Sequence, residues 1–305
     1  MQEQEDTLLV LDFSNQAFLW GELRKNSPRK LEKLPIVKKC LGSIEGNFSL
    51  SFEQPQIKAD YYFCGGFGNF EHIKFTKGIY FTDYPVTEDY KNADTNEHYY
   101  EYFKTLDNDR YSQPDQVFVK QRPYNLFPLQ MVYPKDYHQT LHALKWATES
   151  KRYTIFKTHP AHNGDQNYKA FWGVAKKLGV ISEYTELVDN YRSEELVNEA
   201  DMIFSADSAL TLKAVLKNIP TFAMRNFQMN DIVPVIPEIP LDIKVPIVSK
   251  DKAIKWFDWF YRTVCNDITK DDFKDKINRR LNLYKNGVTD KELHSLTFLK
   301  NKGLA

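Results

Sequence analysis

The sequence predicts an α/β fold with two domains, and three observations support this prediction. Strands and helices alternate between residues 124 and 224, and short apolar strands in the first half end in glycine-rich or acidic loops. The chain has 305 residues, which at roughly 100–200 residues per domain allows one large or two moderate domains, and 42% of the residues are hydrophobic. A chain of this size builds its core without disulfides or metals.

Apolar runs that stop at turn-forming residues mark the strands of the first half. The run at residues 8–11 leads into a polar loop, and the run at 60–64 stops at the glycine-rich loop 65–69. A third run, at 78–81, stops at the acidic turn 82–85. A strand that is followed by a glycine-rich loop and then by another strand is typical of an open α/β sheet with functional loops at its strand ends.

A polar segment separates the two domains. Residues 86–115 are rich in Tyr, Asp and Asn, with one expected helix at 97–106 and the expected linker at 107–115. The N-terminal domain is therefore expected to span residues 1–115 and to be Rossmann-like, so that the chain has two Rossmann-like domains.

Beyond the linker the alternation becomes regular. Strands are expected at residues 124–130, 153–157, 184–188, 202–205 and 221–224. Helices are expected between them at residues 137–150, 166–178, 193–199 and 208–217. Gly179 is a helix stop signal. Five strands alternating with four helices predict a parallel sheet covered on both faces, which is a Rossmann-like domain over residues 116–249.

Two amphipathic helices with aromatic stripes follow at residues 250–266 and 270–286. Such stripes usually face a core, so we assign no cofactor to the tryptophans. The C-terminal helices, residues 250–305, are expected to pack across the two domains or to return toward the first.

The charge is balanced overall and uneven along the chain. Lys plus Arg and Asp plus Glu both number 41, but residues 1–115 hold 13 basic against 19 acidic residues and residues 116–305 hold 28 against 22. An anionic ligand of the second half explains this asymmetry, and two solvated surfaces of unequal composition explain it equally well. The basic segment 24–39 is a candidate for contact with phosphates or an anionic membrane surface, with a solvated surface as the alternative.

Three features bear on location. No apolar stretch approaches the roughly 18–20 residues that span a bilayer. The N-terminus is acidic where a secretory signal is basic. Cys40, Cys64 and Cys265 are widely separated and lack zinc spacing, so we expect reduced packing residues. These features predict a cytoplasmic protein, with peripheral contact at the inner membrane through residues 24–39 left open.

Polar loops follow two strands of the second half, at the carboxyl ends where open parallel sheets bind their ligands. The two loops read Lys157-Thr158-His159-Pro160 and Ser205-Ala206-Asp207-Ser208. The first loop has cationic and hydrogen-bonding groups that can bind a diphosphate. The second loop leads into a helix whose first backbone amides, with the hydroxyls of Ser208 and Thr211, can bind phosphate. A structural loop histidine and a plain helix N-cap serine are the alternatives.

Residues 125–224 resemble the nucleotide-sugar-binding half of GT-B glycosyltransferases, most closely the capsule polysaccharide (Kdo transferase-like) family. The motifs that carry the resemblance are, in chain order, Phe127-Pro128-Leu129-Gln130, Lys157-Thr158-His159-Pro160, Ala200 through Ser208, and Asn218-Ile219-Pro220. The resemblance implies a nucleotide-sugar site made of Gln130, Lys157, His159, Ser205, Asp207, Ser208 and Thr211.

Two positions depart from the family pattern. Lys213 stands where a glutamate often holds the donor ribose, and Asn218 stands where a glycine usually precedes the proline. These departures leave the identity of the donor open.

The turn Phe81-Thr82-Asp83-Tyr84-Pro85 is similar to the strand-end Phe-Thr-Asp of phage DNA β-glucosyltransferase, in which a strand and a Gly-Gly loop also come first. The likeness implies that Asp83 is the catalytic general base for the acceptor hydroxyl. Competing bases are Asp12, Glu71 and His72. A retaining enzyme would need no such base.

The glycine loop that precedes this turn is a candidate part of the interdomain cleft. Gly65, Gly66 and Gly68 let the backbone approach a ligand closely, with a flexible turn as the alternative.

Together these features predict a GT-B-like glycosyltransferase that moves a sugar from a nucleotide-sugar co-substrate to a hydroxyl acceptor, without a metal or other cofactor. A bacterial surface glycan is the first candidate acceptor. Hydroxymethylated phage DNA, held by residues 24–39, is the second. A sugar-nucleotide 2-epimerase and a non-catalytic sugar-nucleotide-binding protein are the other function classes left open.

Overall fold

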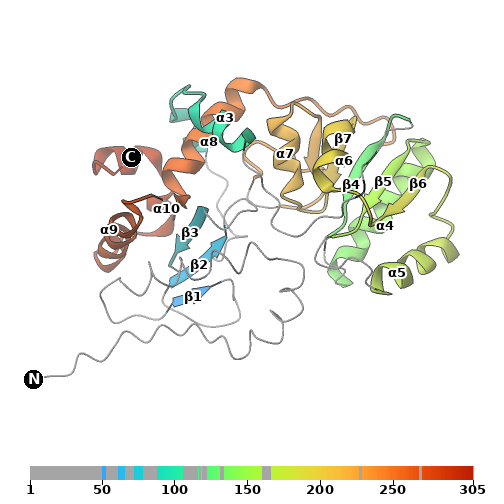
Figure 1. Ribbon diagram of the computed structural model, residues 1–305, viewed down its shortest axis with the longest axis horizontal. Coiled ribbons are helices and arrows are strands. Elements are labelled where there is room, and N and C mark those ends of the chain that lie inside the picture. The colour runs from blue at the N-terminus through green and yellow to red at the C-terminus, as the bar shows by residue number, and fades with distance from the viewer. Residues whose placement is uncertain are drawn as a thin grey trace, which may run out of the picture. The chain divides into compact units, whose positions relative to one another are not determined.

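The chain divides into two compact units (Figure 1). The central unit is Ser112–Ala253, and the terminal unit combines Met1–Tyr111 with Ile254–Ala305. The residues described by this computed structural model are 50–52, 61–65, 72–77, 88–105, 116, 118, 122–130, 134–159, 166–226, 229–267 and 270–304. The expected strands at 8–11 and 78–81 and the basic segment 24–39 lie outside these ranges.

The central unit is built on a sheet of five parallel strands. They are β4 (Asn125–Pro128), β5 (Thr154–Lys157), β6 (Thr185–Val188), β7 (Met202–Ser205) and β8 (Thr221–Ala223). Their order is β6-β5-β4-β7-β8, and all neighbours run parallel. The chain starts in the middle of the sheet, adds two strands on one side and then crosses to the other, as in Rossmann-type sheets. The predicted α/β class is therefore confirmed.

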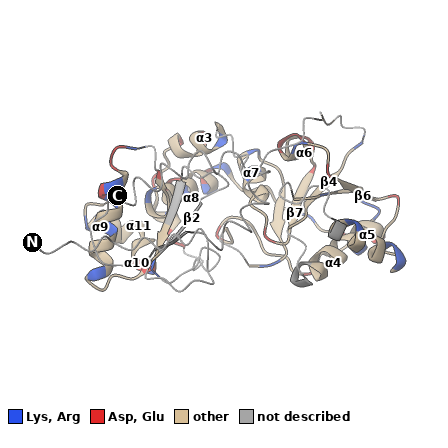
Figure 2. Ribbon diagram, turned by 60° about the horizontal axis from the view of Figure 1, so that its bottom comes forward, with Lys and Arg blue, Asp and Glu red and all other residues tan. Residues whose placement is uncertain are grey.

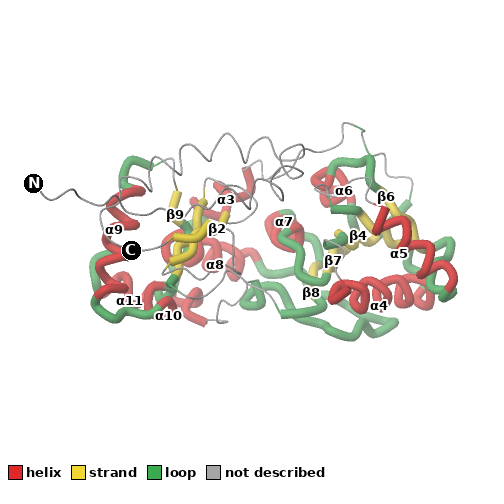
Figure 3. The backbone as a smooth tube through the Cα atoms, turned by 90° about the horizontal axis from the view of Figure 1, so that it is seen from below, coloured by secondary structure: helices red, strands yellow, loops and turns green. Residues whose placement is uncertain are grey.

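Four helices cover the two faces of this sheet. They are α4 (Pro134–Ser150), α5 (Gln166–Lys177), α6 (Ser193–Glu199) and α7 (Leu210–Leu216). The first two pack on one face and the last two on the other (Figure 3). The helix expected at 137–150 begins earlier, at Pro134, because a proline has no N–H to leave unpaired in a first helical turn.

Alternate side chains of the strands face the two helix layers, as the period of two along a strand requires. The layer of α4 and α5 packs on four phenylalanines that are at most 1% exposed: Phe127, Phe156, Phe204 and Phe222. The layer of α6 and α7 packs on Leu126, Ile155 and Ile203. Phe204 is central, because its ring lies 5.2 Å from Phe127, 5.0 Å from Phe222 and 5.3 Å from Trp146 of α4.

The described strands of the terminal unit form a mixed sheet. They are β1 (Leu50–Phe52), β2 (Tyr61–Gly65), β3 (His72–Thr76) and β9 (Asn266–Asp267), in the order β1-β2-β3-β9. Only β1 and β2 are parallel, whereas β3 runs antiparallel to both of its neighbours. In this respect the described strands differ from the parallel sheet of a Rossmann-like domain, and the sequence did not predict β3 or β9.

Helices of both chain ends complete the terminal unit. They are the short 3-10 helix η1 (Glu88–Asn92), α3 (His98–Thr105), α8 (Lys250–Thr263), α9 (Phe273–Lys285), α10 (Asp290–Leu293) and α11 (Leu296–Asn301). The aromatic stripe of α8 is buried, with Trp256 at 0% and Trp259 at 3% exposed, so its prediction as a core face is confirmed. Cys265, just beyond α8, is a buried free thiol.

A buried carboxylate joins three elements of the terminal unit. Asp290, at the start of α10, accepts hydrogen bonds from the Lys77 amide at 3.0 Å and from the Tyr284 hydroxyl of α9 at 2.5 Å. Lys77 follows β3 directly, so this carboxylate connects the mixed sheet to the C-terminal helices. Among the described residues, no helix has the length and apolar character needed to cross a membrane.

We predict that Phe204→Ala lowers the free energy of unfolding of the central unit by about 3–5 kcal/mol, because the truncation leaves a cavity between β4, β8 and α4. Val174→Ala on α5 is the control, since that valine is 52% exposed and its truncation should change stability by less than about 0.5 kcal/mol. Guanidinium unfolding followed by circular dichroism measures both. Equal effects of the two changes would contradict the packing described above.

Candidate functional site

The predicted site residues of the central unit follow or end three neighbouring strands of its sheet, β5, β4 and β7. Because the strands are parallel, these residues lie at the same edge of the sheet. The chain crosses from one side of β4 to the other before it forms β7, so the topological switch point lies between β4 and β7. Open α/β sheets bind ligands at this point. Gln130 follows one of these two strands and Ser205 ends the other.

Hydrogen bonds fix the loop after β7. The Ser205 hydroxyl accepts from the Ser208 amide at 2.8 Å, and the Ser208 hydroxyl accepts from the Leu210 amide at 3.3 Å. The Thr211 hydroxyl donates to the Ser208 carbonyl at 2.7 Å, and all three hydroxyl-bearing residues are buried. These hydroxyls therefore hold the turn that leads into α7.

An ion pair joins the loops after β7 and β8. The guanidinium of Arg225 donates to one carboxylate oxygen of Asp207 through Nε at 2.9 Å and Nη2 at 2.6 Å. The two side chains are 25% and 26% exposed, so the pair is partly open to solvent. Sequence reasoning missed Arg225. Arg225 lies just beyond β8. The rule that open parallel sheets bind ligands at the carboxyl ends of their strands therefore applies to it as well.

Lys157 is a buried cation at the end of β5, only 1% exposed. Its ammonium group donates to the carbonyls of Thr158 at 3.0 Å and of Asp189 at 3.4 Å. Burial lowers the pKa of Lys157 to about 8, and the Asp189 carboxylate opposes this shift. At pH 7 the side chain is thus still mostly charged, and its charge is held among carbonyl oxygens.

Tyr168 of α5 connects two loops that the sequence assigned to the site. Its hydroxyl donates to the Gln130 carbonyl at 2.8 Å and accepts from the His159 amide at 3.3 Å. The loops after β4 and β5 are therefore held together by one buried side chain, 2% exposed. Sequence reasoning missed Tyr168, because an aromatic residue on an amphipathic helix has the pattern of a core residue.

The two departures from the family pattern have structural explanations. Asn218 has φ +57°, in the left-handed region that glycine favours and asparagine tolerates, so it can replace the usual glycine. Lys213 is buried, and its ammonium lies 3.8 Å from Glu194 of α6, which also lies 3.7 Å from Lys217. Lys213 thus belongs to an ion-pair cluster between α6 and α7.

The site residues predicted for the first half fall largely outside the described residues. Asp83, Gly66 and Gly68 are outside them, and Gly65 is the last residue of β2, paired with Ile73. These assignments stay predictions. Within the described ranges, no group of three or more His, Cys, Asp or Glu residues is placed to hold a metal ion.

No model of a known protein family and no curated protein matches the chain. Solved structures do. The beta Kdo 2,4 transferase of Thermosulfurimonas dismutans KpsC is 10% identical with a TM-score of 0.47, and the beta Kdo 2,7 transferase is 13% identical with a TM-score of 0.43. Each of these matches covers 75% of this chain and 87% of the other. The UDP-GlcNAc 2-epimerase of Methanocaldococcus jannaschii is 14% identical with a TM-score of 0.31, over 61% of this chain and 50% of the other.

We predict that the stability of the wild type relative to Lys157→Met rises as the pH increases from about 8 to about 10.5. In this window the unfolded chain keeps the lysine proton and the folded chain releases it, so rising pH favours the folded state. The full change is roughly 3 kcal/mol at 1.36 kcal/mol per pKa unit.

Denaturant unfolding at several pH values measures this difference. Lys145→Met is the control, because the Lys145 side chain is 64% exposed and its removal should leave the difference constant across the window. A constant difference for Lys157→Met as well would show that its pKa is not lowered.

Proposed function

We propose that this protein is a GT-B-like glycosyltransferase that moves a sugar from a nucleotide-sugar to a hydroxyl acceptor in the synthesis of a bacterial surface polysaccharide. One observation carries the proposal. The residues that the resemblance assigns to the nucleotide-sugar lie at the ends of β5 and β7, in the loops after β4, β5 and β7, and in the first turn of α7. This is the edge and switch point where a Rossmann-type sheet binds its ligand.

Positive charge at this edge supports the choice of a phosphate-bearing donor. Lys157 holds a buried ammonium at the end of β5. After β8, the partly exposed guanidinium of Arg225 is ion-paired with Asp207, so its charge is partly balanced. His159 lies in the loop beside Lys157 and is partly exposed. When the bond between the anomeric carbon and the phosphate oxygen breaks, its electron pair stays on the phosphate, and nearby fixed cations stabilise that charge. In this proposal no metal ion is needed.

The acceptor step is assigned from the sequence alone. The acceptor hydroxyl oxygen attacks the anomeric carbon while Asp83 takes its proton, which gives inversion at that carbon. The proposed acceptor is a glycan hydroxyl.

We predict that one nucleoside mono- or diphosphate stabilises the wild type in a thermal-shift screen. A ligand present at a hundredfold excess over its Kd contributes about 2.7 kcal/mol to the folded state. His159→Ala should weaken this binding by about tenfold, the effect of losing one charge-assisted hydrogen bond. His138→Ala is the matched control, because His138 is an exposed histidine of α4.

Isothermal titration measures the affinities of the three proteins. If no nucleotide or nucleotide-sugar binds, and His159→Ala changes no activity, the glycosyltransferase proposal is wrong.

We predict that Asp83→Asn slows sugar transfer by about 10²–10⁴-fold and leaves nucleotide affinity unchanged, since a general base acts on the acceptor and not on the donor. Transfer is measured with the nucleotide-sugar that the screen identifies. Glu71→Gln is the comparison, because Glu71 is a competing base. Loss of transfer in Glu71→Gln with full activity in Asp83→Asn would reassign the base.

The same assays separate the rival functions. Conversion of a nucleotide-sugar without any acceptor would indicate a 2-epimerase, and binding without turnover of any donor would indicate a binding protein. Salt-sensitive retention on duplex DNA, lost when Arg29, Lys30 and Lys33 are neutralised, would indicate a DNA acceptor.

A further inference from the structure

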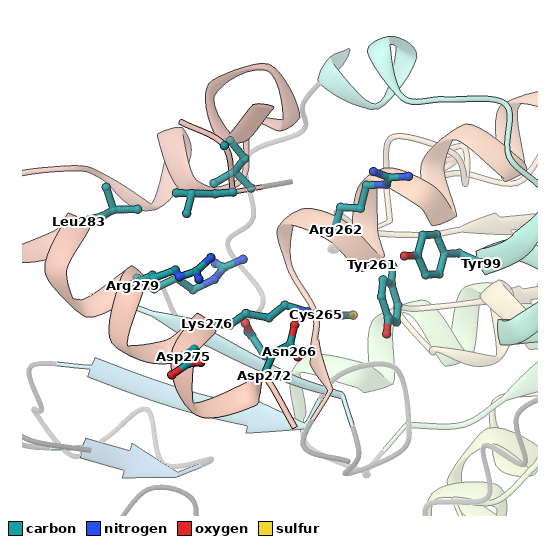
Figure 4. A pocket seen from close by; sticks show the side chains of 14 residues that line it. Tyr99, Tyr261, Arg262, Cys265, Asn266, Asp272, Asp275, Lys276, Arg279 and Leu283 are labelled. Carbon is teal, nitrogen blue, oxygen red and sulfur yellow. Dashed lines mark ion pairs between the residues drawn. The ribbon is translucent and has the colours of Figure 1, made fainter. Parts of the chain in front are cut away.

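A pocket of about 370 Å³ in the terminal unit is lined by residues of α3, α8, α9 and α11 and by those that follow α8 and α11 (Figure 4). Figure 2 shows the Lys and Arg residues along α9, where Lys276 lies 3.1 Å from Asp272. Arg262 of α8 lies 3.0 Å from Asp258. The lining mixes paired charges with apolar groups and does not identify one class of ligand. The edge of the central sheet is different, because there a single side chain joins two loops.

The hydrogen-bonded ladder between β4 and β5 ends where the side chain of Tyr168 takes part. The Leu129 amide, just after β4, donates at 2.8 Å to the carbonyl of Lys157, the last residue of β5. In the register of the two strands, the next bond of a parallel ladder would join the His159 amide to the Leu129 carbonyl. The His159 amide donates to the Tyr168 hydroxyl at 3.3 Å. This hydroxyl therefore stands at the place of the next ladder bond.

The Tyr168 hydroxyl links the two loops through one oxygen atom. It donates to the Gln130 carbonyl at 2.8 Å while it accepts from the His159 amide, so two hydrogen bonds in series connect the two backbones. Two bonds in series span more than a single N–H···O bond, whose heavy atoms lie about 2.9–3.0 Å apart. The hydroxyl thus sets the spacing of the loops after β4 and β5 at the edge of the sheet.

The core of the central unit fixes the position of this hydroxyl. Tyr168 lies in the first turn of α5, and its side chain is 2% exposed within the layer that α4 and α5 form on the sheet. Side chains in a close-packed interior have little freedom to change rotamer. The core therefore holds the tyrosine, and the tyrosine holds the backbone of Gln130 and His159.

We propose that Tyr168 is a positioning residue of the nucleotide-sugar site, a role that rests on the proposed function. Its hydroxyl keeps the backbone at Gln130 and His159 in the geometry that binds the nucleotide phosphate. Tyr168 acts through these residues and not by contact with the nucleotide. A change confined to the hydroxyl therefore weakens nucleotide binding through His159.

Tyr168→Phe removes only the hydroxyl, and Tyr124→Phe is the matched control. Tyr124 is also 2% exposed, and its hydroxyl donates to the Leu196 carbonyl at 2.6 Å. It lies directly before β4, at the opposite end of that strand from the site. Both changes remove a buried hydroxyl and its hydrogen bonding, so they should lower the melting temperature by similar amounts. A purely structural role of Tyr168 would leave the two variants with equal nucleotide affinities.

Isothermal titration of the full chain uses as probes the 5′-mono- and diphosphates of adenosine, cytidine, guanosine, uridine and thymidine, one at a time. For the probe that binds the wild type most tightly, Tyr168→Phe should weaken binding by about fivefold, the net effect of one hydrogen bond. Tyr124→Phe should weaken it by less than about 1.5-fold. In a His159→Ala background, Tyr168→Phe should weaken binding by less than about twofold, because the group through which it acts is already absent.

Amide hydrogen exchange followed by NMR tests the bridge without a nucleotide. The His159 amide should exchange at least about tenfold faster in Tyr168→Phe than in the wild type, because it loses its acceptor. Tyr124→Phe should leave this rate within about twofold of the wild type. Equal exchange in the wild type and Tyr168→Phe overturns the role of Tyr168, whatever the titrations show.

The titrations separate failure of this role from failure of the proposed function. If no probe binds the wild type, the proposed function is wrong and the role of Tyr168 is wrong with it. The role of Tyr168 alone is wrong if a probe binds the wild type and Tyr168→Phe equally well, or if Tyr124→Phe weakens binding as much. It is also wrong if the effects of Tyr168→Phe and His159→Ala are fully additive.

Discussion

The packing around Phe204 is the interaction on which the geometry of the candidate site depends. This ring touches aromatic side chains of β4, β8 and α4, and therefore joins the strands on both sides of the switch point. Ser205 comes directly after Phe204 and ends β7, so the same packing places the residue from which the loop into α7 begins. Because the neighbouring strands run parallel, the loops after β5, β4 and β7 lie at one edge of the sheet.

A second constraint is that polar groups at a buried edge need partners. The Lys157 ammonium donates hydrogen bonds to two carbonyls, and the Ser205 hydroxyl accepts a hydrogen bond from the Ser208 amide. The Tyr168 hydroxyl is a hydrogen-bond partner for backbone groups of two loops, the His159 amide and the Gln130 carbonyl. The edge is thus shaped by its own hydrogen bonds before any ligand binds. In the proposed transfer reaction, such preorganisation favours electrostatic stabilisation of the leaving group, because fixed cations need no reorientation when charge develops.

The elements that sequence could predict are those specified by local pattern. The helix of α6 and the strand of β7 have the predicted ends, since their apolar periodicity and flanking residues are local signals. β9 could not be predicted, because its two residues are extended only through pairing with β3, nearly 200 residues earlier in the chain. The roles of Tyr168 and Arg225 likewise depend on which residues the fold brings near them, on Gln130 in one case and Asp207 in the other.

The departure at Lys213 bears on how a donor would be held. In the family that residues 125–224 resemble, this position often holds a glutamate that binds the ribose, whereas here a buried ammonium faces Glu194 and helps to join α6 to α7. Asn218, by contrast, keeps the backbone turn of the glycine it replaces. The turn between α7 and β8 is therefore compatible with the family pattern while the ribose contact is not. If a nucleotide-sugar binds at this edge, groups other than Lys213 must recognise its ribose.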